Sequence, residues 1–155
     1  MPGTIVVGVD GSAPSLAALR WAADEANLRD ARLVAVHAWV FIPPAPLAEP
    51  GLGPIPAADL PAQLEAQRDA AEAEFHAAIE EAFSGAPPVE IERKLTEEDP
   101  REALEKESKS ADLVVIGSRG RSGIAAALLG SVSKHVVDHA ACPVVVIKGP
   151  QPDRR

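Results

Sequence analysis

The stretch DLVVIGSRGRSGIAAALLGSVSKHVV, residues 112–137, decides the fold class of this chain. It opens on DLVVIG, an apolar run rich in β-branched residues that predicts a strand covered on both faces. It closes on SVSKHVV, which predicts the start of a helix. A glycine-rich link thus joins a buried strand to a helix, and this unit is typical of α/β proteins with parallel sheets.

The rest of the chain repeats this alternation of strand and helix. Ser12 is expected to cap one helix, with Pro14 in its first turn, and Asp99 before Pro100 predicts a second helix start. We expect an α/β fold, an open and mostly parallel five-stranded sheet with helices on both faces. The predicted strands cover residues 4–9, 31–39, 89–95, 112–117 and 143–148, and the predicted helices cover residues 12–30, 64–82, 99–111 and a segment from about 131.

The alternating pattern of VEIERKL, residues 89–95, predicts an edge strand with one wet face. Residues 1–149 are expected to form a single domain. Within it, residues 40–60 are rich in proline, so we expect a long loop that acts as a lid or a contact surface. Residues 150–155 are expected to be a flexible tail.

Composition excludes several classes of protein. The 155 residues are 46% hydrophobic, which predicts a globular domain, and the net charge is −8. This charge argues against binding to nucleic acid or to an anionic membrane, yet backbone amides can still bind a small anion. The lone Cys142 leaves no intrachain disulfide and no cysteine-rich metal site. With no leader or membrane span predicted, we expect a cytoplasmic protein.

The glycines after the fourth predicted strand have the spacing Gly117-x-x-Gly120, nine residues, then Gly130-Ser131. This is neither a Walker A loop nor a GxGxxG motif. Gly117 ends a strand, where a missing side chain lets a ligand approach, and a positive φ would be one reason for glycine at position 130. The free N–H groups at the following helix start would suit phosphate oxygens. The alternative is that these glycines only turn the chain.

Asp10 follows the first predicted strand as Gly117 ends the fourth. If these strands are neighbours at the point where strand order reverses, both residues line the crevice in which ligands of such sheets bind. Among other candidates, His135 and His139 are four residues apart, but no third metal ligand is visible. His37 is expected to be a satisfied core histidine and Cys142 a small packing residue.

Four motifs in order resemble the universal stress protein family, in its ATP-binding branch. They are IVVGVDGS, the second strand with His37, DLVVIGSRG with its G-2x-G-9x-G-S spacing, and HAACPVVVIK near the end. The resemblance covers nearly the whole chain except the proline-rich loop and the tail. It implies the strand order 3-2-1-4-5, and a homodimer formed by antiparallel pairing of the strand Pro143–Lys148.

The resemblance also implies a site for ATP with Mg²⁺. Asp10 resembles the aspartate near the ribose, the phosphates and the metal, and the backbone of Ala38 resembles the group that meets the adenine. The loop before Pro100 lacks the glycine found in many members, so its part in the site stays open. The full set of expected nucleotide contacts is Gly8, Asp10, Ala38, Ile116, Gly117, Gly120, Arg121, Gly130, Ser131, Val132 and Ser133.

Three functions remain open at this stage. The first is a nucleotide-dependent regulatory module in a stress response, acting on an unknown partner or on the dimer. The second is a slow ATP-hydrolysing enzyme, although Asp10 is the only candidate base near the phosphates. The third is a nucleotide-free structural module, against which the intact glycine spacing argues.

Overall fold

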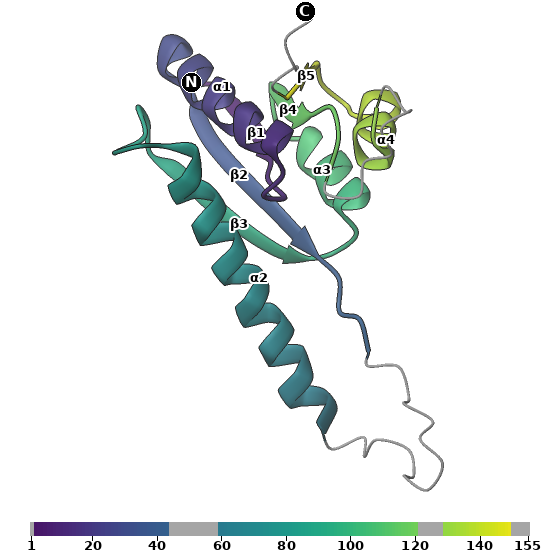
Figure 1. Cartoon of the computed structure of the whole chain (residues 1–155). Helices are drawn as coiled ribbons and strands as arrows, with labels where there is room; N and C mark the ends of the chain where they lie inside the picture. The colour runs from purple at the N-terminus through teal and green to yellow at the C-terminus, as the bar shows by residue number, and fades with distance from the viewer. Residues whose placement is uncertain (1, 44–58, 121–128, 150–155) are drawn as a thin grey trace, which may run out of the picture.

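Five parallel strands form one sheet in the order β3-β2-β1-β4-β5 in the computed structural model, which describes residues 2–43, 59–120 and 129–149 (Figure 1). This confirms the expected fold class and strand order. The strands are β1 Thr4–Gly8, β2 Arg32–Trp39, β3 Ile91–Glu97, β4 Leu113–Gly117 and β5 Val144–Ile147, and the helices are α1 Ala13–Arg29, α2 Leu60–Ala82, α3 Pro100–Ser108 and α4 Ser131–His139.

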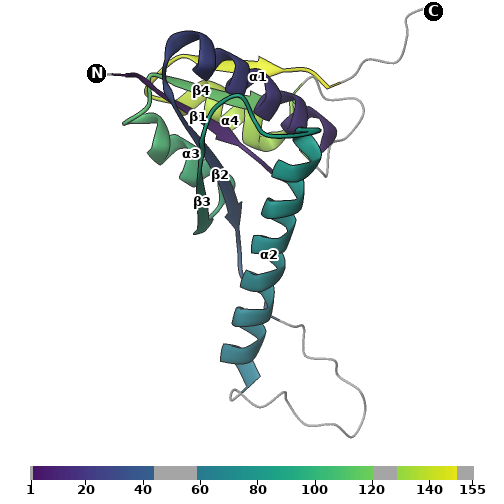
Figure 2. The ribbon, with the colours of Figure 1, turned by 90° about the vertical axis from the view of Figure 1, so that its left-hand side faces the viewer.

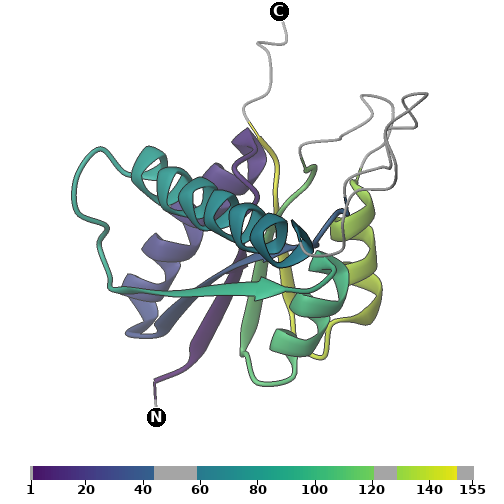
Figure 3. The same ribbon diagram turned by 90° about the horizontal axis from the view of Figure 1, so that it is seen from below.

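Two apolar layers hold the helices on opposite faces of this sheet (Figure 3). Successive strand residues point to opposite faces, so Val7 packs under α1 and α2, whereas Val6 packs under α3 and α4. The first layer includes Leu19 and Phe75, and the second includes Leu104. Because both faces are covered, the central strands need apolar residues throughout, which is the pattern that predicted them.

β3 is an edge strand, as predicted, but it lies two residues later in the chain than the alternation indicated. Its ladder with β2 runs from Leu33↔Ile91 to Trp39↔Glu97, and Glu98 N–H donates to the Trp39 carbonyl at 2.9 Å. Val89 precedes the ladder but packs against the α1–α2 layer, so its apolar character reflects burial and not strand pairing.

α2 begins at Leu60, one turn before its predicted start, and extends beyond the end of the sheet (Figure 2). Its C-terminal half buries Ala71, Phe75, Ala78, Ile79 and Ala82 against the sheet and α1. None of the described helices is both long and apolar enough to cross a membrane. The expected lid or contact loop at residues 40–60 falls mostly outside the described residues, as does the expected tail.

Both predicted helix caps are confirmed. Ser12 Oγ accepts Ser15 N–H at the start of α1, at 3.4 Å, and Asp99 Oδ1 accepts Arg101 N–H at the start of α3, at 2.9 Å. Asp99 also takes a bidentate pair of hydrogen bonds from the Arg101 guanidinium. That side-chain hydrogen bonding lowers the pKa of the Asp99 carboxyl to about 2.

We expect Asp99→Ala to lower the free energy of unfolding by about 1 kcal/mol at neutral pH, because the cap of α3 is lost. A carboxyl whose pKa is depressed by folding stabilises above its unfolded pKa, near 4, and loses that effect as pH falls through the folded value. The two proteins should therefore differ at pH 7 and converge as the pH falls from about 4 toward about 2. Urea unfolding at several pH values measures this, and a difference as large at pH 2 as at pH 7 would contradict it.

Candidate functional site

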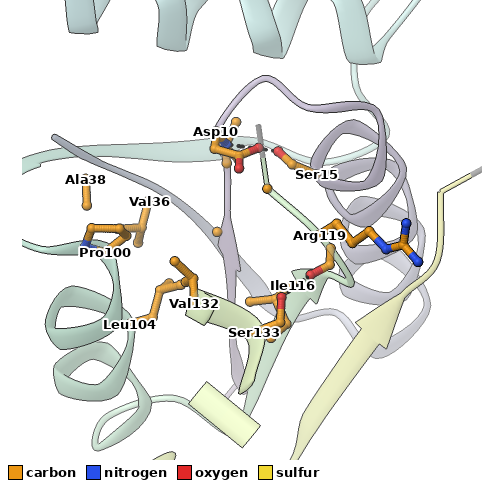
Figure 4. A pocket seen from close by; sticks show the side chains of 14 residues that line it. Asp10, Ser15, Val36, Ala38, Pro100, Leu104, Ile116, Arg119, Val132 and Ser133 are labelled. Atoms are coloured by element: carbon orange, nitrogen blue, oxygen red, sulfur yellow. Dashed lines mark hydrogen bonds between the residues drawn. The ribbon is translucent and has the colours of Figure 1, made fainter. Parts of the chain in front are cut away.

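The strand order reverses between β1 and β4, and a pocket opens there beyond the carboxyl ends of the strands (Figure 4). It encloses about 560 Å³ of empty space, counting the part open to solvent. This is the crevice in which ligands of open parallel sheets bind. Its lining consists of Gly8, Val9, Asp10, Ser15, Val36, Ala38, Pro100, Leu104, Ile116, Gly117, Arg119, Gly120, Val132 and Ser133.

The lining separates into an apolar half and a polar half (Figure 4). The side chains of Val36, Ala38, Pro100 and Leu104 gather on one side, from β2 and α3. Polar groups of the β1 and β4 ends and of the first turns of α1 and α4 lie on the other side. The pocket thus suits a ligand with one flat apolar part and one polar or charged part.

The backbone of Ala38 presents hydrogen-bonding groups at the apolar half that no described residue bonds on the β1 side. Val36 and Gly8 are register partners, and Val9 N–H donates to the Val36 carbonyl at 2.9 Å. Every second residue of a strand faces the same neighbour, so the N–H and C=O of Ala38 also point to the β1 side. The ladder with β1 has ended by then, so one donor and one acceptor at the pocket rim have no partner among the described residues.

Asp10 is held by its own turn at the polar half. Its Oδ1 accepts Ser12 N–H at 2.9 Å and the Ser12 hydroxyl at 2.5 Å, while its N–H donates to Ser15 Oγ at 2.9 Å. Gly11 has a φ of 80°, which lets the chain reverse between Asp10 and the helix. None of the described residues donates to Oδ2, and a Cβ added at Gly120 would lie 2.8 Å from it. One carboxylate oxygen is therefore engaged and the other faces the glycine-rich segment.

Gly117 is a glycine for a reason that sequence did not indicate. A Cβ at this position would lie 2.8 Å from the Pro14 carbonyl carbon and from Ser15 N, so the end of β4 packs directly on the first turn of α1. The group that approaches Gly117 closely is therefore the start of α1, whereas the sequence had predicted that a ligand would approach it. It fixes Ser15, whose hydroxyl in turn holds the Asp10 backbone.

The start of α4 closes the polar half. Gly130 is its N-cap with φ −70°, so the positive φ considered for this residue is wrong, and an extended backbone suffices. No described side chain caps the helix; the first helical bond runs from Lys134 N–H to the Gly130 carbonyl. None of the described residues accepts the N–H groups of residues 131–133. The Ser133 hydroxyl donates to the Gly117 carbonyl at 2.6 Å and so joins α4 to β4.

The structure brings most of the expected contact residues together. Eight of them line the pocket, namely Gly8, Asp10, Ala38, Ile116, Gly117, Gly120, Val132 and Ser133. Gly130 and Ser131 lie just outside it, and a Cβ at Gly130 would contact the backbone of Arg119 and Gly120 at 3.4 Å. The expected contact at Arg121 lies outside the described residues.

Six lining residues were not among the expected contacts, namely Val9, Ser15, Val36, Pro100, Leu104 and Arg119. Pro100 and Leu104 belong to α3, and the loop before this helix lacks the glycine that many family members have before the proline. Ser15 had one usable signal, its place in the first turn of a helix that follows a strand at the crevice. The apolar residues gave no signal distinct from core packing.

The histidines act as structural side chains. The His37 Nδ1–H donates to the Val9 carbonyl at 2.7 Å, and its ring stacks on Phe75, which confirms the expected core role. His135 Nε2 donates to Glu105 Oε2 at 2.8 Å, and this hydrogen bond lowers the pKa of the Glu105 carboxyl. His139 stacks on His135. Within the described ranges, no group of three or more metal-ligating side chains is gathered.

Cys142 is half-buried beside the α3–α4 layer, less enclosed than expected for a core residue. Desolvation raises the pKa of its thiol, which disfavours the reactive thiolate.

Residues 1–148 match the family model described as the universal stress protein family. The chain belongs to the universal stress protein family. A universal stress protein of Mycolicibacterium smegmatis is 37% identical to it over 145 residues, 94% of this chain and 48% of the relative. The chain spans about half the length of the curated relatives it matches.

Solved structures of universal stress proteins share this fold. One is a universal stress protein in complex with cAMP, which is 30% identical to this chain with a TM-score of 0.56. The match covers 94% of this chain and 95% of that protein's chain. Another, from Archaeoglobus fulgidus in complex with dAMP, is 28% identical with a TM-score of 0.51, and covers 96% of this universal stress protein and 98% of its own chain.

Proposed function

We propose that this protein binds ATP in the β1–β4 pocket and acts as a nucleotide-dependent regulatory module in a stress response. The observation that carries the proposal is the pairing of an apolar half, which fits a purine, with a helix start at the other end that no described side chain caps. The N–H groups of residues 131–133 and the dipole of α4 favour an anion at that end. Relatives in complex with cAMP and dAMP differ in sugar and phosphate but share adenine, which supports an adenine nucleotide here.

In this proposal the adenine lies between the apolar side chains of β2 and α3. The N–H and C=O of Ala38 match the acceptor and donor on the purine edge, because adenine presents a ring nitrogen beside an amino group. Gly8 lets Leu104 pack against the end of β1 at the pocket wall, since a Cβ there would lie 3.0 Å from Leu104 Cδ1. Gly120, Gly130 and the residues that follow it surround the phosphates.

Asp10 fits the role of a ligand to nucleotide-bound Mg²⁺. This ion usually takes one or two carboxylates and completes its shell with phosphates and water. Asp10 Oδ1 is fixed by Ser12 while Oδ2 faces Gly120, so one oxygen is oriented and available. The metal would neutralise phosphate charge, and the protein's share is to position that carboxylate.

A regulatory role is favoured over catalysis because Asp10 is the one carboxylate among the described lining residues. Used as a metal ligand, it is lost as a base for an attacking water. Slow hydrolysis is the second candidate, and a nucleotide-free structural module is the third. We place the protein in the cytoplasm in this proposal, with a regulatory partner whose chemistry is addressed below.

Calorimetric titration of freshly purified protein with ATP, with and without Mg²⁺, tests the proposal. We expect Ser131→Ala to weaken ATP binding by roughly ten- to a hundredfold, because a hydroxyl bond to a charged group contributes roughly 1.5–3 kcal/mol. Ser110→Ala, at the far end of α3, serves as the control and should bind as wild type does. If the wild-type protein binds no adenine nucleotide, the regulatory and the hydrolytic functions are both excluded, and the nucleotide-free structural module is the candidate that remains.

We also propose a homodimer through the segment Pro143–Lys148. β5 is the second edge of the sheet, is apolar and is only half-buried, and an exposed edge of this kind invites pairing with a second copy. Val145→Lys should give a monomer, since a two-fold contact would bring both new lysines into one interface. Sedimentation measures this, with Arg93→Glu on the opposite edge as the control. A wild-type monomer at tens of micromolar would contradict the dimer.

A further inference from the structure

The first three turns of α2 lie outside the packed body of the protein (Figures 1 and 2). No residue from Asp59 to Ala70 is buried, whereas burial begins at Ala71 and continues through the rest of the helix. The segment that follows β2 runs alongside these turns in both views. We call residues 40–43 and 59–70 together the arm.

A side-chain clamp holds the two strips of the arm together. Gln67 Oε1 accepts Ile42 N–H at 2.9 Å, and Gln67 Nε2 donates to the Ile42 carbonyl at 2.7 Å. The amide satisfies both backbone groups of Ile42, much as a neighbouring strand would. The two strips therefore form one surface although 15 residues separate them in the chain.

That surface exposes large apolar side chains. Six such side chains are exposed in the described part of the protein, and four belong to the arm: Val40 at 53%, Ile42 at 72%, Leu60 at 40% and Leu64 at 36%. Leu60, Leu64 and Gln67 recur at helical spacing, so they share the face against which Ile42 is clamped. Single exposed apolar side chains are common on protein surfaces, but a contiguous group of them typically marks a site of contact with another molecule.

Acidic side chains surround this apolar face. Asp59, Glu65 and Asp69 lie on the arm, where Arg68 is the one basic side chain. Glu72 lies one turn beyond, in a hollow that Asp69 and Arg93 also line. All of these side chains are exposed. A second copy docked here by two-fold symmetry would bring acid against acid, which opposes self-association. A basic partner would instead place a positive charge opposite each of these acidic side chains, which favours binding.

We propose that the arm docks a basic amphipathic helix of a partner protein. The leucines of α2 form a ridge, and the matching shape for such a ridge is the groove of another helix. Residues 60–70 span roughly 16 Å, enough for about three turns of the partner. The docking surface is separate from the nucleotide pocket, but β2 connects them, since Ala38 lines the pocket and Val40 begins the arm.

The probe is a synthetic helical peptide of about 18 residues, built from leucine and lysine with leucines along one face, and labelled for fluorescence anisotropy. Its matched control replaces every lysine by glutamate. We expect the lysine peptide to bind the nucleotide-free protein and to be weakened by salt, and the glutamate peptide to bind at least about tenfold more weakly. Because no nucleotide is present, the result does not depend on the proposed function.

Variants then locate the binding. The double variant Ile42→Ser with Leu64→Ser should weaken the lysine peptide at least about tenfold, and Glu65→Lys with Asp69→Lys should do the same. Leu28→Ser is the control, because Leu28 is 80% exposed and lies beside Asp24 and Glu25 but outside the arm. Circular dichroism should show all variants folded, since none of these side chains is buried.

Three results would overturn the proposal. One is equal binding of the peptide to wild type and to both arm variants, which would mean attraction to acidic surface in general. Another is a wild-type dimer that the arm variants dissociate, which would make a second copy the occupant. The third is binding that appears only after residues 44–58 are replaced by a glycine-serine linker of equal length, which would make the chain's own segment the occupant.

Discussion

Gly117→Ala is expected to lower the free energy of unfolding by about 3 kcal/mol, the upper end of what one inserted methyl group costs in a packed core. The new Cβ would lie 2.8 Å from the Pro14 carbonyl carbon and from Ser15 N, and 2.9 Å from Pro14 Cβ. These are mostly backbone atoms of a helix whose Leu16 and Leu19 are buried, so they cannot give way by a rotamer change. The end of β4 and the start of α1 must separate instead.

Gly85→Ala is the matched control, since a Cβ there meets nothing within 4 Å. It should leave stability unchanged or raise it slightly, because alanine restricts the unfolded chain. Urea unfolding of the three proteins compares midpoints and slopes. Equal midpoints for Gly117→Ala and wild type would show that α1 accommodates the methyl, and the packing argument would then be wrong.

Gly117 also shows where sequence reasoning reached its limit. The residue could be placed at the crevice, because a glycine that ends a buried strand beside Asp10 suits a ligand site. Its contact with Pro14 and Ser15 could not be predicted, since it depends on how α1 crosses the sheet. The same holds for Leu104 and Pro100, which reach the pocket only because α3 covers the end of β2.

The strands were predictable because burial on both faces demands apolar, β-branched runs, as in β1 and β4. The edge strand β3 was harder to place. Its alternation begins with Val89, but the ladder begins at Ile91, and pairing register with β2 is a tertiary property. The arm was hidden for a related reason: Leu64 and Phe75 share one helical stripe, and only the length of the sheet decides that Phe75 is buried while Leu64 is exposed.

Asp10→Asn is expected to weaken ATP binding by up to about a hundredfold when Mg²⁺ is present, because interactions with a charged group contribute roughly 1.5–3 kcal/mol. The amide keeps the size of the side chain and one oxygen for Ser12, so the turn should persist. Without Mg²⁺, the carboxylate in the proposed site would face the phosphates as a like charge. Removing that charge should then leave ATP affinity unchanged or improve it.

The two conditions separate the possible roles of Asp10. If the carboxylate orders only the turn through Ser12, or if it contacts only the ribose, the loss on substitution should be similar with Mg²⁺ and with EDTA. If it holds the metal, the loss should appear with Mg²⁺ alone. Calorimetric titration of wild type and Asp10→Asn in both buffers gives the four affinities, and thermal unfolding checks that the fold is intact. A loss of equal size in both buffers would remove Asp10 from the metal site, while the turn it makes with Ser12 and Ser15 would remain its role.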